Sequence, residues 1–268
     1  MKYGFIGTGC MGGALATACA KAIGPEDILL SNRSPEKAQA LAEKLGAIPA
    51  DNETITRDCD VIFLGVKPQT MAQMLLPLQP ILTGRRTPFV LVSMAAGVTI
   101  EALQDMAGGR YPVVRIMPNT ACAVGAGMTT YTCSAEVTDR QRQMVLDALA
   151  ASGLLEEIEE GLMGAASAVA GCGGAYACLF LEGLADGGVL CGLPRKKAQR
   201  MAAQMLLGMA TQALESGEHT GALKDAVCSP AGSTIAGIRK LESMSFRSAA
   251  MEAVIAAWER EREMQQQK

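Results

Sequence analysis

Short apolar runs alternate with longer segments of helical periodicity over residues 1–160. Each run has the length of a buried strand, and the segments between them repeat Ala and Leu at helical spacing. This alternation predicts an α/β domain with a doubly wound sheet. The expected strands cover residues 3–6, 28–31, 60–66, 89–94, 111–116, 128–131 and 155–158, with a further short strand and its turn at 47–51. The main expected helices cover residues 12–23, 35–45, 69–76, 99–106 and 138–151.

The pattern changes near residue 162, where strand signals stop and long Ala-, Leu- and Met-rich segments predict helices. These helices cover residues 176–191, 194–215 and 230 to the C-terminus. We therefore expect an α/β domain over residues 1–160 and an all-α domain over residues 161–268. The second domain is so apolar that we expect its helices to bury surface against a second subunit.

One uncharged stretch fits two environments. Residues 162–181 carry no charge over a length that would cross a membrane. Four glycines (Gly164, Gly171, Gly173 and Gly174) interrupt the stretch, and it is a single isolated segment. We interpret it as a helical interface of small residues buried in protein, and we expect no membrane contact.

A glycine-rich turn follows the first expected strand and opens the first expected helix. Gly7, Gly9 and Gly12 have the spacing of a dinucleotide-binding βαβ unit, the start of a Rossmann-type fold. Gly7 would permit the tight turn, Gly9 the close approach of a pyrophosphate, and Gly12 the close packing of helix on strand. The first N–H groups of the helix would face the phosphates. A purely structural turn is the alternative, because glycine-rich turns are common.

The end of the second expected strand bears on the choice of cofactor. Enzymes that prefer NAD usually place Asp or Glu there, to hold the ribose 2′-hydroxyl. This chain has Ser31, Asn32, Arg33 and Ser34 instead, and an arginine with a hydroxyl suits a 2′-phosphate. We therefore expect NADPH, with NADH as the alternative. Ser34 also fits a helix N-cap with Pro35 at the first helical position, and the two roles are compatible.

Composition argues against several other classes of function. The net charge is −3 and the sequence has no basic block, so we expect no nucleic-acid partner. The nine cysteines form no CxxC pair and there is one histidine, so we expect neither a metal site nor a disulfide framework. With no visible secretory signal, an odd number of thiols suits a reducing cytoplasm.

Six motifs are spread over the whole chain. They are the loop at residues 7–12, Phe63 to Pro68, Ser93 to Gly97, Arg115 to Thr120, Leu184 to Arg195, and His219 to Ile235. Together they resemble the pyrroline-5-carboxylate reductase family, which makes proline by NAD(P)H-dependent reduction of a cyclic imine. The last motif is the most specific, whereas the first is shared by many dehydrogenases.

The resemblance implies a cofactor along the carboxyl edge of the sheet and a cyclic imino acid as substrate between the two domains. It also implies homodimers interlocked through an all-α dimerisation domain, gathered into a pentamer of dimers. The substrate-binding residues that it implies are Ser229, Ala231, Gly232, Ser233 and Thr234. The cofactor-binding residues, expected from the resemblance and from the turns above, are Ile6, Gly7, Thr8, Gly9, Cys10, Met11, Gly12, Asn32, Arg33, Ser34, Asn52, Val66, Lys67, Pro68, Ala95, Ala96 and Gly97.

The chemistry of the 229–234 loop agrees with this placement. The substrate is a small carboxylate, and N–H groups at a helix N-terminus bind an anion without a charged side chain. A protonated cyclic iminium already accepts hydride well, so proximity and orientation are the main contributions. We expect the Thr234 hydroxyl, near the imine nitrogen, to be catalytic. His219 is either a general acid or the acceptor of a structural hydrogen bond, and Lys67 is expected to meet the cofactor through its backbone.

Several residues near the expected substrate pocket depart from the family pattern. They are Ala121, Ala170, Cys172, Gly174, Thr220 and Ala231. If position 231 needs a positive φ, the alanine is strained there. A divergent paralogue that reduces another cyclic imine, and a non-catalytic NADP-binding protein, are therefore alternatives. A hydroxyacid-type dehydrogenase is disfavoured, because residues 171–186 contain no lysine.

Overall fold

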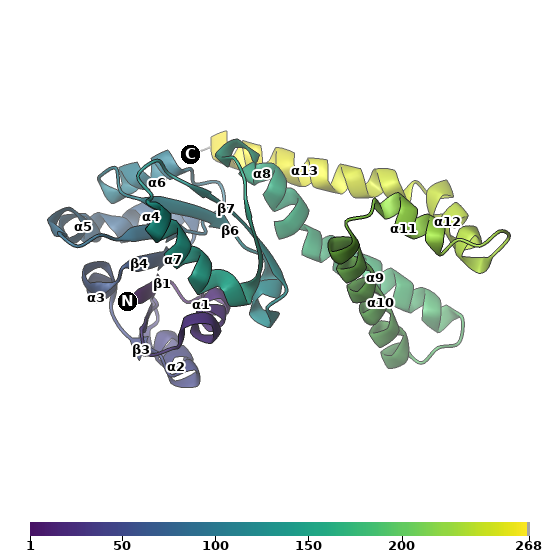
Figure 1. The fold of residues 1–268 in the computed structure, drawn as a ribbon, viewed down its shortest axis with the longest axis horizontal. Coiled ribbons are helices and arrows are strands. Elements are labelled where there is room, and N and C mark those ends of the chain that lie inside the picture. Colours follow the sequence, from purple (N-terminus) through teal and green to yellow (C-terminus); the bar gives the residue numbers. More distant parts are fainter. Residues whose placement is uncertain (267–268) are drawn as a thin grey trace. The chain divides into compact units, whose positions relative to one another are not determined.

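The fold is that of a computed structural model, which describes residues 1–266. By packing, these residues form two compact units (Figure 1). The first unit comprises residues 1–172 and 257–266, and the second comprises residues 173–256. The chain therefore leaves the first unit after Cys172, later than the predicted boundary at residue 160, and returns to it at Ala257.

One eight-stranded sheet is the centre of the first unit, as far as the described residues go. Its strands are β1 (Tyr3–Ile6), β2 (Ile28–Ser31), β3 (Ile48–Pro49), β4 (Val61–Leu64), β5 (Val90–Ser93), β6 (Val113–Met117), β7 (Gly127–Cys133) and β8 (Gly153–Glu157). The strand order is β3-β2-β1-β4-β5-β6-β7-β8, and all neighbours are parallel except β6 and β7. This order confirms the predicted doubly wound α/β domain.

Helices cover both faces of this sheet (Figure 1). They are α1 (Cys10–Ile23), α2 (Pro35–Leu45), α3 (Asn52–Asp58), α4 (Pro68–Leu75), α5 (Gln79–Gly84), α6 (Ile100–Ala107), α7 (Asp139–Leu149) and α8 (Met163–Ala166). Successive strand residues point to opposite faces, so two cores form. Phe5 and Phe63 stack in one core with ring centroids 4.3 Å apart, whereas Ile62 and Leu91 lie in the other. With both faces buried, the strand ends are the edge left for ligands.

Most elements predicted for this unit are present with shifted ends. In the short strand and turn predicted at residues 47–51, the strand is limited to Ile48–Pro49, because Pro49 lacks an N–H group and is tolerated only at the sheet edge. The predicted Thr138 cap of α7 is confirmed as a capping box. The Thr138 hydroxyl accepts a bond from the Gln141 N–H at 3.3 Å, and the Gln141 side chain accepts one from the Thr138 N–H at 3.0 Å.

The second unit is helical over its described length. It contains α9 (Gly173–Leu190), α10 (Arg195–Ser216), α11 (Thr220–Ala226), α12 (Ser233–Ser243) and the first part of α13 (Phe246–Gln266). Helices α9 and α10 pack side by side (Figure 1). The Tyr176 hydroxyl donates a hydrogen bond to the Ala253 carbonyl at 3.1 Å and so joins α9 to α13.

The single helix predicted from residue 230 to the C-terminus is wrong. The helix α12 starts only at Ser233, and a break at Met244 and Ser245 separates it from α13. Ser245 has a φ of +58°, a left-handed conformation that cannot continue a right-handed helix. The short helix α11 was not predicted, because its seven residues are too few to show a periodic pattern.

One helical run, residues 160–190, is long and apolar enough to cross a membrane by length and composition alone. It runs through α8, a π-helical turn at Ser167–Gly171, and α9. The chain itself buries only 11% of its most apolar window. Most of this window is therefore at least partly exposed in the single chain.

Candidate functional site

The glycine loop between β1 and α1 is built as its spacing predicts. Gly7 has a φ of +99°, and a Cβ there would lie 2.7 Å from the backbone of Gly65. A Cβ on Gly12 would lie 2.1 Å from the Gly7 carbonyl oxygen, so only glycine lets α1 pack this closely. A Cβ on Gly9 would meet no atom within 4 Å. Gly9 therefore faces open space, where a phosphate group can approach the backbone.

The start of α1 adds donors at the same place. Gly9 is the N-cap residue, and the first turn carries no acidic side chain. The first N–H groups of a helix have no partner inside the helix, and they lie at the positive end of its dipole. Gly9 and Cys10 are exposed. This end of α1 thus fits an anionic group.

Asn32 ties the glycine loop to the turn after β2. Its side-chain amide donates to the Thr8 hydroxyl at 3.1 Å, and its carbonyl oxygen accepts from the Ser34 N–H at 3.1 Å. Ser34 occupies the predicted N-cap position of α2 and Pro35 the first turn, but the Ser34 side chain makes no capping bond. The Lys37 N–H instead bonds to the Ser34 backbone carbonyl at 3.0 Å. The Ser34 hydroxyl is thus available to a ligand.

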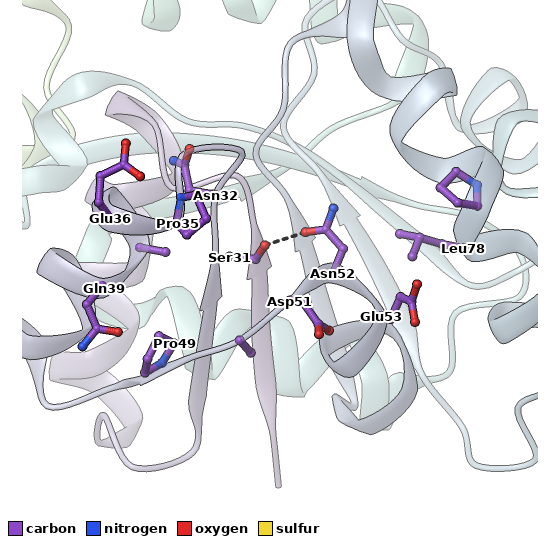
Figure 2. A pocket seen from close by; sticks show the side chains of 13 residues that line it. Ser31, Asn32, Pro35, Glu36, Gln39, Pro49, Asp51, Asn52, Glu53 and Leu78 are labelled. Atoms are coloured by element: carbon purple, nitrogen blue, oxygen red, sulfur yellow. Dashed lines mark hydrogen bonds between the residues drawn. The ribbon is translucent and has the colours of Figure 1, made fainter.

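A pocket of about 840 Å³ lies beyond this turn, between the ends of β2 and β3 and the start of α3 (Figure 2). The Ser31 hydroxyl donates to the Asn52 side-chain oxygen at 2.5 Å, which fixes the Asn52 amide at the pocket wall. The sequence did not point to the remaining lining residues, because the sheet order brings them together. They are Pro35, Glu36, Ala38, Gln39, Pro49, Ala50, Asp51, Glu53, Pro77 and Leu78.

One carboxylate at this pocket already accepts a hydrogen bond from the backbone. The Asp51 side chain accepts the Thr54 N–H at 2.7 Å as the N-cap of α3, and this bond lowers the pKa of Asp51. Arg33 is exposed and follows the lining residue Asn32 in the sequence. The site therefore offers Arg33 and Ser34 for a 2′-phosphate, and no acidic residue stands at the end of β2 itself.

The remaining expected cofactor residues follow β4 and β5. Residues 66–68 come after β4, and residues 95–97 come after β5. Because β2, β1, β4 and β5 are parallel neighbours, their carboxyl ends meet at one edge of the sheet. Lys67 is the N-cap residue of α4, and its side chain is exposed. The structure thus brings the expected cofactor residues to a common edge.

The expected substrate loop lies in the second unit and leads into α12. Ala231 has a φ of +58°, so the strain expected for an alanine at this position is present. Gly232 is the N-cap residue, and its N–H donates to the Ser229 carbonyl at 3.0 Å. Ser233 and Thr234 form the exposed first turn. Their hydroxyls bond to no group among the described residues, so they are free to meet a ligand.

The side chain of His219 makes the hydrogen bond expected of a structural role, and this bond uses only one of its two ring nitrogens. It is the N-cap of α11, and its Nδ1 accepts the Gly221 N–H at 3.0 Å. Among the residues that the structure describes, no group of three or more His, Cys, Asp or Glu side chains could hold a metal ion.

Two family profiles match the chain. One, described as pyrroline-5-carboxylate reductase dimerisation, covers residues 160–264. The other, described as NADP oxidoreductase, coenzyme F420-dependent, covers residues 2–97. These ranges contain the helical second unit and the glycine loop respectively.

Curated relatives and solved structures are similar over almost the whole chain. The pyrroline-5-carboxylate reductase of Methanosarcina acetivorans is 40% identical over 98% of this chain and 97% of its own length, and that of Escherichia coli is 38% identical over 97% and 96%. The Plasmodium falciparum pyrroline carboxylate reductase structure with NADP bound matches with a TM-score of 0.87 at 34% identity, covering 99% of this chain and 98% of that one. The Coxiella burnetii pyrroline-5-carboxylate reductase matches with a TM-score of 0.90 at 31% identity, covering 98% and 97%. This chain belongs to the pyrroline-5-carboxylate reductase family.

Proposed function

We propose that this protein reduces 1-pyrroline-5-carboxylate to L-proline with NADPH as the reductant. Similarity to reductases of this name over the full length supports the proposal. The observation that carries it most directly is the 229–234 loop, which matches the family's most specific motif. The Ser233 and Thr234 hydroxyls of this loop are exposed and have no partner in the described chain.

The first unit would hold the cofactor. NADPH supplies a hydride from its nicotinamide ring, and the structure solved from Plasmodium falciparum holds NADP. We assign the pyrophosphate to the open face at Gly9 and the start of α1, where N–H groups point outward. Arg33 and the free Ser34 hydroxyl would bind the 2′-phosphate, and Asn52 would line the adenosine side. The remaining assigned contacts are Ile6 to Thr8, Cys10 to Gly12, Asn32, Val66 to Pro68, and Ala95 to Gly97.

The 229–234 loop would hold the substrate. The first N–H groups of α12 would bind the carboxylate, helped by the hydroxyls of Ser229 and Ser233. The Thr234 hydroxyl would lie at the imine nitrogen and orient the ring for hydride transfer. This chain then contributes position and exclusion of water rather than a strong acid or base.

The strained Ala231 favours one second candidate. An alanine at φ +58° in the loop that holds the substrate alters the local backbone energy where the family pattern has glycine. A different cyclic imine is therefore the alternative substrate.

One assay separates these functions. Purified protein is mixed with NADPH and, in turn, pyrroline-5-carboxylate, the six-membered cyclic imine acid, and 2- and 3-oxo acids. We expect the fastest NADPH oxidation with pyrroline-5-carboxylate, together with formation of L-proline. Faster turnover of another imine would assign the alternative substrate. Tight NADPH binding without turnover of any compound would contradict an enzymatic role.

The second unit, we further propose, forms a homodimer that assembles into a pentamer of dimers. The family profile over residues 160–264 is itself described as a dimerisation region, which supports self-association. Large apolar side chains stand exposed on α9 and α10, including Leu179, Leu190, Leu207 and Leu214. A partner subunit would cover them and residues 160–190, rather than lipid. All nine cysteines are free thiols, in keeping with a cytoplasmic location.

A further inference from the structure

A second cavity, of about 390 Å³, lies in the first unit, and none of its lining residues is among the expected cofactor residues. Its polar and aromatic walls are Thr99, Arg115, Glu160, Trp258, Glu261 and Arg262. Residues 258–262 belong to the end of α13, which is part of the first unit by packing. The volume exceeds that of a single water and reaches the lower end of the range for small-molecule sites.

Arg115, on β6, lines this cavity and has one edge of its guanidinium group without a partner in the described chain. Its side chain is 3% exposed, and its Nη1 bonds to Glu160 Oε1 at 3.1 Å. Its Nε and Nη2 are buried and have no partner in the described chain. These two nitrogens carry the parallel N–H groups that bind a carboxylate in bidentate fashion. A buried fork of this kind is costly unless a ligand or water meets it.

Glu261 presents the complementary acceptor. It is buried, and its Oε1 has no hydrogen-bond partner among the described groups. Burial raises the pKa of Glu261, and hydrogen bonding from Ser167 partly opposes this. Of the two acids in this cavity, Glu160 and not Glu261 lies within the 4.0 Å limit of an ion pair with Arg115. A gap therefore separates the free guanidinium edge from the free carboxyl oxygen.

An aromatic wall lies beside this gap. The Arg262 guanidinium stands 4.9 Å from the centre of the Trp258 ring. A Cβ on Gly164 would lie 3.6 Å from Trp258 Cδ1, in ordinary van der Waals contact. Glycine at this position therefore leaves space beside the ring that a methyl group would fill. The cavity thus combines charged groups of both signs with one aromatic side chain.

We propose that this cavity binds a small zwitterionic amino acid, with its carboxylate on the Nε/Nη2 fork of Arg115 and its ammonium group on Oε1 of Glu261. The carbon atoms would lie against Trp258. Glu160 and Glu261 would repel a phosphate dianion, although Arg115 and Arg262 would attract it, and a simple carboxylate would leave Glu261 without a partner. The residues that line this cavity all belong to the first unit, whereas the proposed substrate loop belongs to the second.

Trp258 is the one tryptophan of the chain, so intrinsic fluorescence reports on this cavity. The full-length protein, without NADPH, is titrated with glycine, L-alanine and L-proline at constant ionic strength. Acetate carries the carboxylate alone and methylammonium carries the ammonium group alone. Inorganic phosphate tests whether the cavity binds any anion. We expect a saturable change with the amino acids and at least about tenfold weaker binding of either half.

Variants separate this site from others. Glu261→Gln removes the charged acceptor, and Arg115→Lys keeps the charge but removes the fork, so each should weaken amino-acid binding about tenfold. Arg260→Gln is the matched control, because Arg260 is on the same helix, is exposed and pairs with Glu263. Thr234→Ala tests the proposed substrate loop and should leave the response unchanged. Circular dichroism melting checks that each variant is folded. If Arg115→Lys is not folded, the comparison of amino acids with acetate and methylammonium on the unmodified protein tests the proposal instead.

Three results would overturn the proposal. The first is the lack of a saturable response to any amino acid, which would mean that water alone fills the cavity. The second is a response to phosphate only. The third is an amino-acid response that survives in Glu261→Gln or disappears in Thr234→Ala.

Discussion

Ala231 holds a left-handed backbone conformation that a residue with a Cβ disfavours. At φ +58°, an alanine destabilises the folded state by about 1 kcal/mol relative to glycine. Part of this difference is cancelled, because glycine makes the unfolded chain more flexible and so lowers its free energy. Ala231→Gly should therefore raise the free energy of unfolding by about 0.5 kcal/mol, measured by urea denaturation. Ala236→Gly, in the interior of α12, is the control and should lower it by about 0.5–1 kcal/mol. Equal signs for the two variants would contradict this account.

Thr234 is the residue on which the proposed chemistry depends. Thr234→Ala removes the hydroxyl that we place at the imine nitrogen, so kcat/KM for pyrroline-5-carboxylate should fall by about tenfold to a hundredfold. Affinity for NADPH, measured by calorimetry, should stay unchanged, and Thr234→Ser should keep most of the activity. Thr83→Ala is the control, because the Thr83 hydroxyl is exposed in the first unit and bonds only to the Tyr111 hydroxyl. Full activity of Thr234→Ala would remove this residue from the mechanism.

Glu261 gives a pH dependence of known sign. Because burial raises its pKa, the folded protein keeps the proton to higher pH than the unfolded chain does. Its contribution to stability is present below the unfolded pKa and is lost as pH rises through the folded pKa. The charged groups around it are Arg115, Glu160 and Arg262.

Glu261→Gln should therefore raise the free energy of unfolding more at pH 8 than at pH 4, by urea denaturation at the two values. Glu263→Gln, an exposed change on the same helix, should show no such difference. The same effect of Glu261→Gln at both pH values would show that its ionisation is not linked to folding.

At the scale of elements, the turn after β2 decides the cofactor. Arg33→Gln should raise KM for NADPH about tenfold and leave KM for NADH nearly unchanged, because only NADPH carries the 2′-phosphate. Steady-state kinetics with both cofactors measures this. Arg140→Gln, exposed on α7, is the control for a general loss of positive charge. An equal loss with both cofactors would place Arg33 elsewhere than at the 2′-phosphate.

Local signals in the sequence predicted most of the helices and strands, but they did not predict the side-chain contacts between them. Gly7 and Gly12 could be interpreted from the sequence because each is needed for a steric reason. A Cβ at either position would clash with neighbouring backbone atoms. The bond from Asn32 to Thr8 could not be predicted, because it depends on the register of two strands. The break at Ser245 was missed because serine is not by itself a helix terminator, and its positive φ has no signal in the local sequence.

In the candidate site, too, the sequence identified single residues but not the contacts between distant segments. Motif residues were identified from the chain alone, whereas the pocket wall at Pro49 and Leu78 depends on which elements the sheet brings together. Arg115 lay inside a predicted motif, but its approach to Glu261 depends on a helix that returns from the second unit. Contacts between residues so far apart in sequence have no local signature.

At the scale of the whole molecule, the exposed apolar helices predict the assembly. Leu207, on α10, is 58% exposed. If a partner subunit covers it, Leu207→Glu should dissociate the dimer, as measured by light scattering coupled to size-exclusion chromatography. Gln199→Glu adds the same charge on α10 without removing apolar surface, and it should disturb the assembly less. An unchanged mass for Leu207→Glu would place the interface elsewhere.

The return of α13 to the first unit also bears on how the protein is made. Residues 257–266 leave the ribosome only after the entire second unit has been synthesised. Domains fold largely in the order of synthesis, so the sheet of the first unit can form while Arg115 has Glu160 but not yet Trp258 and Glu261 beside it. The first unit is thus begun early in translation and finished last, and a nascent chain stalled at residue 256 would carry an open wall where the finished protein has a cavity.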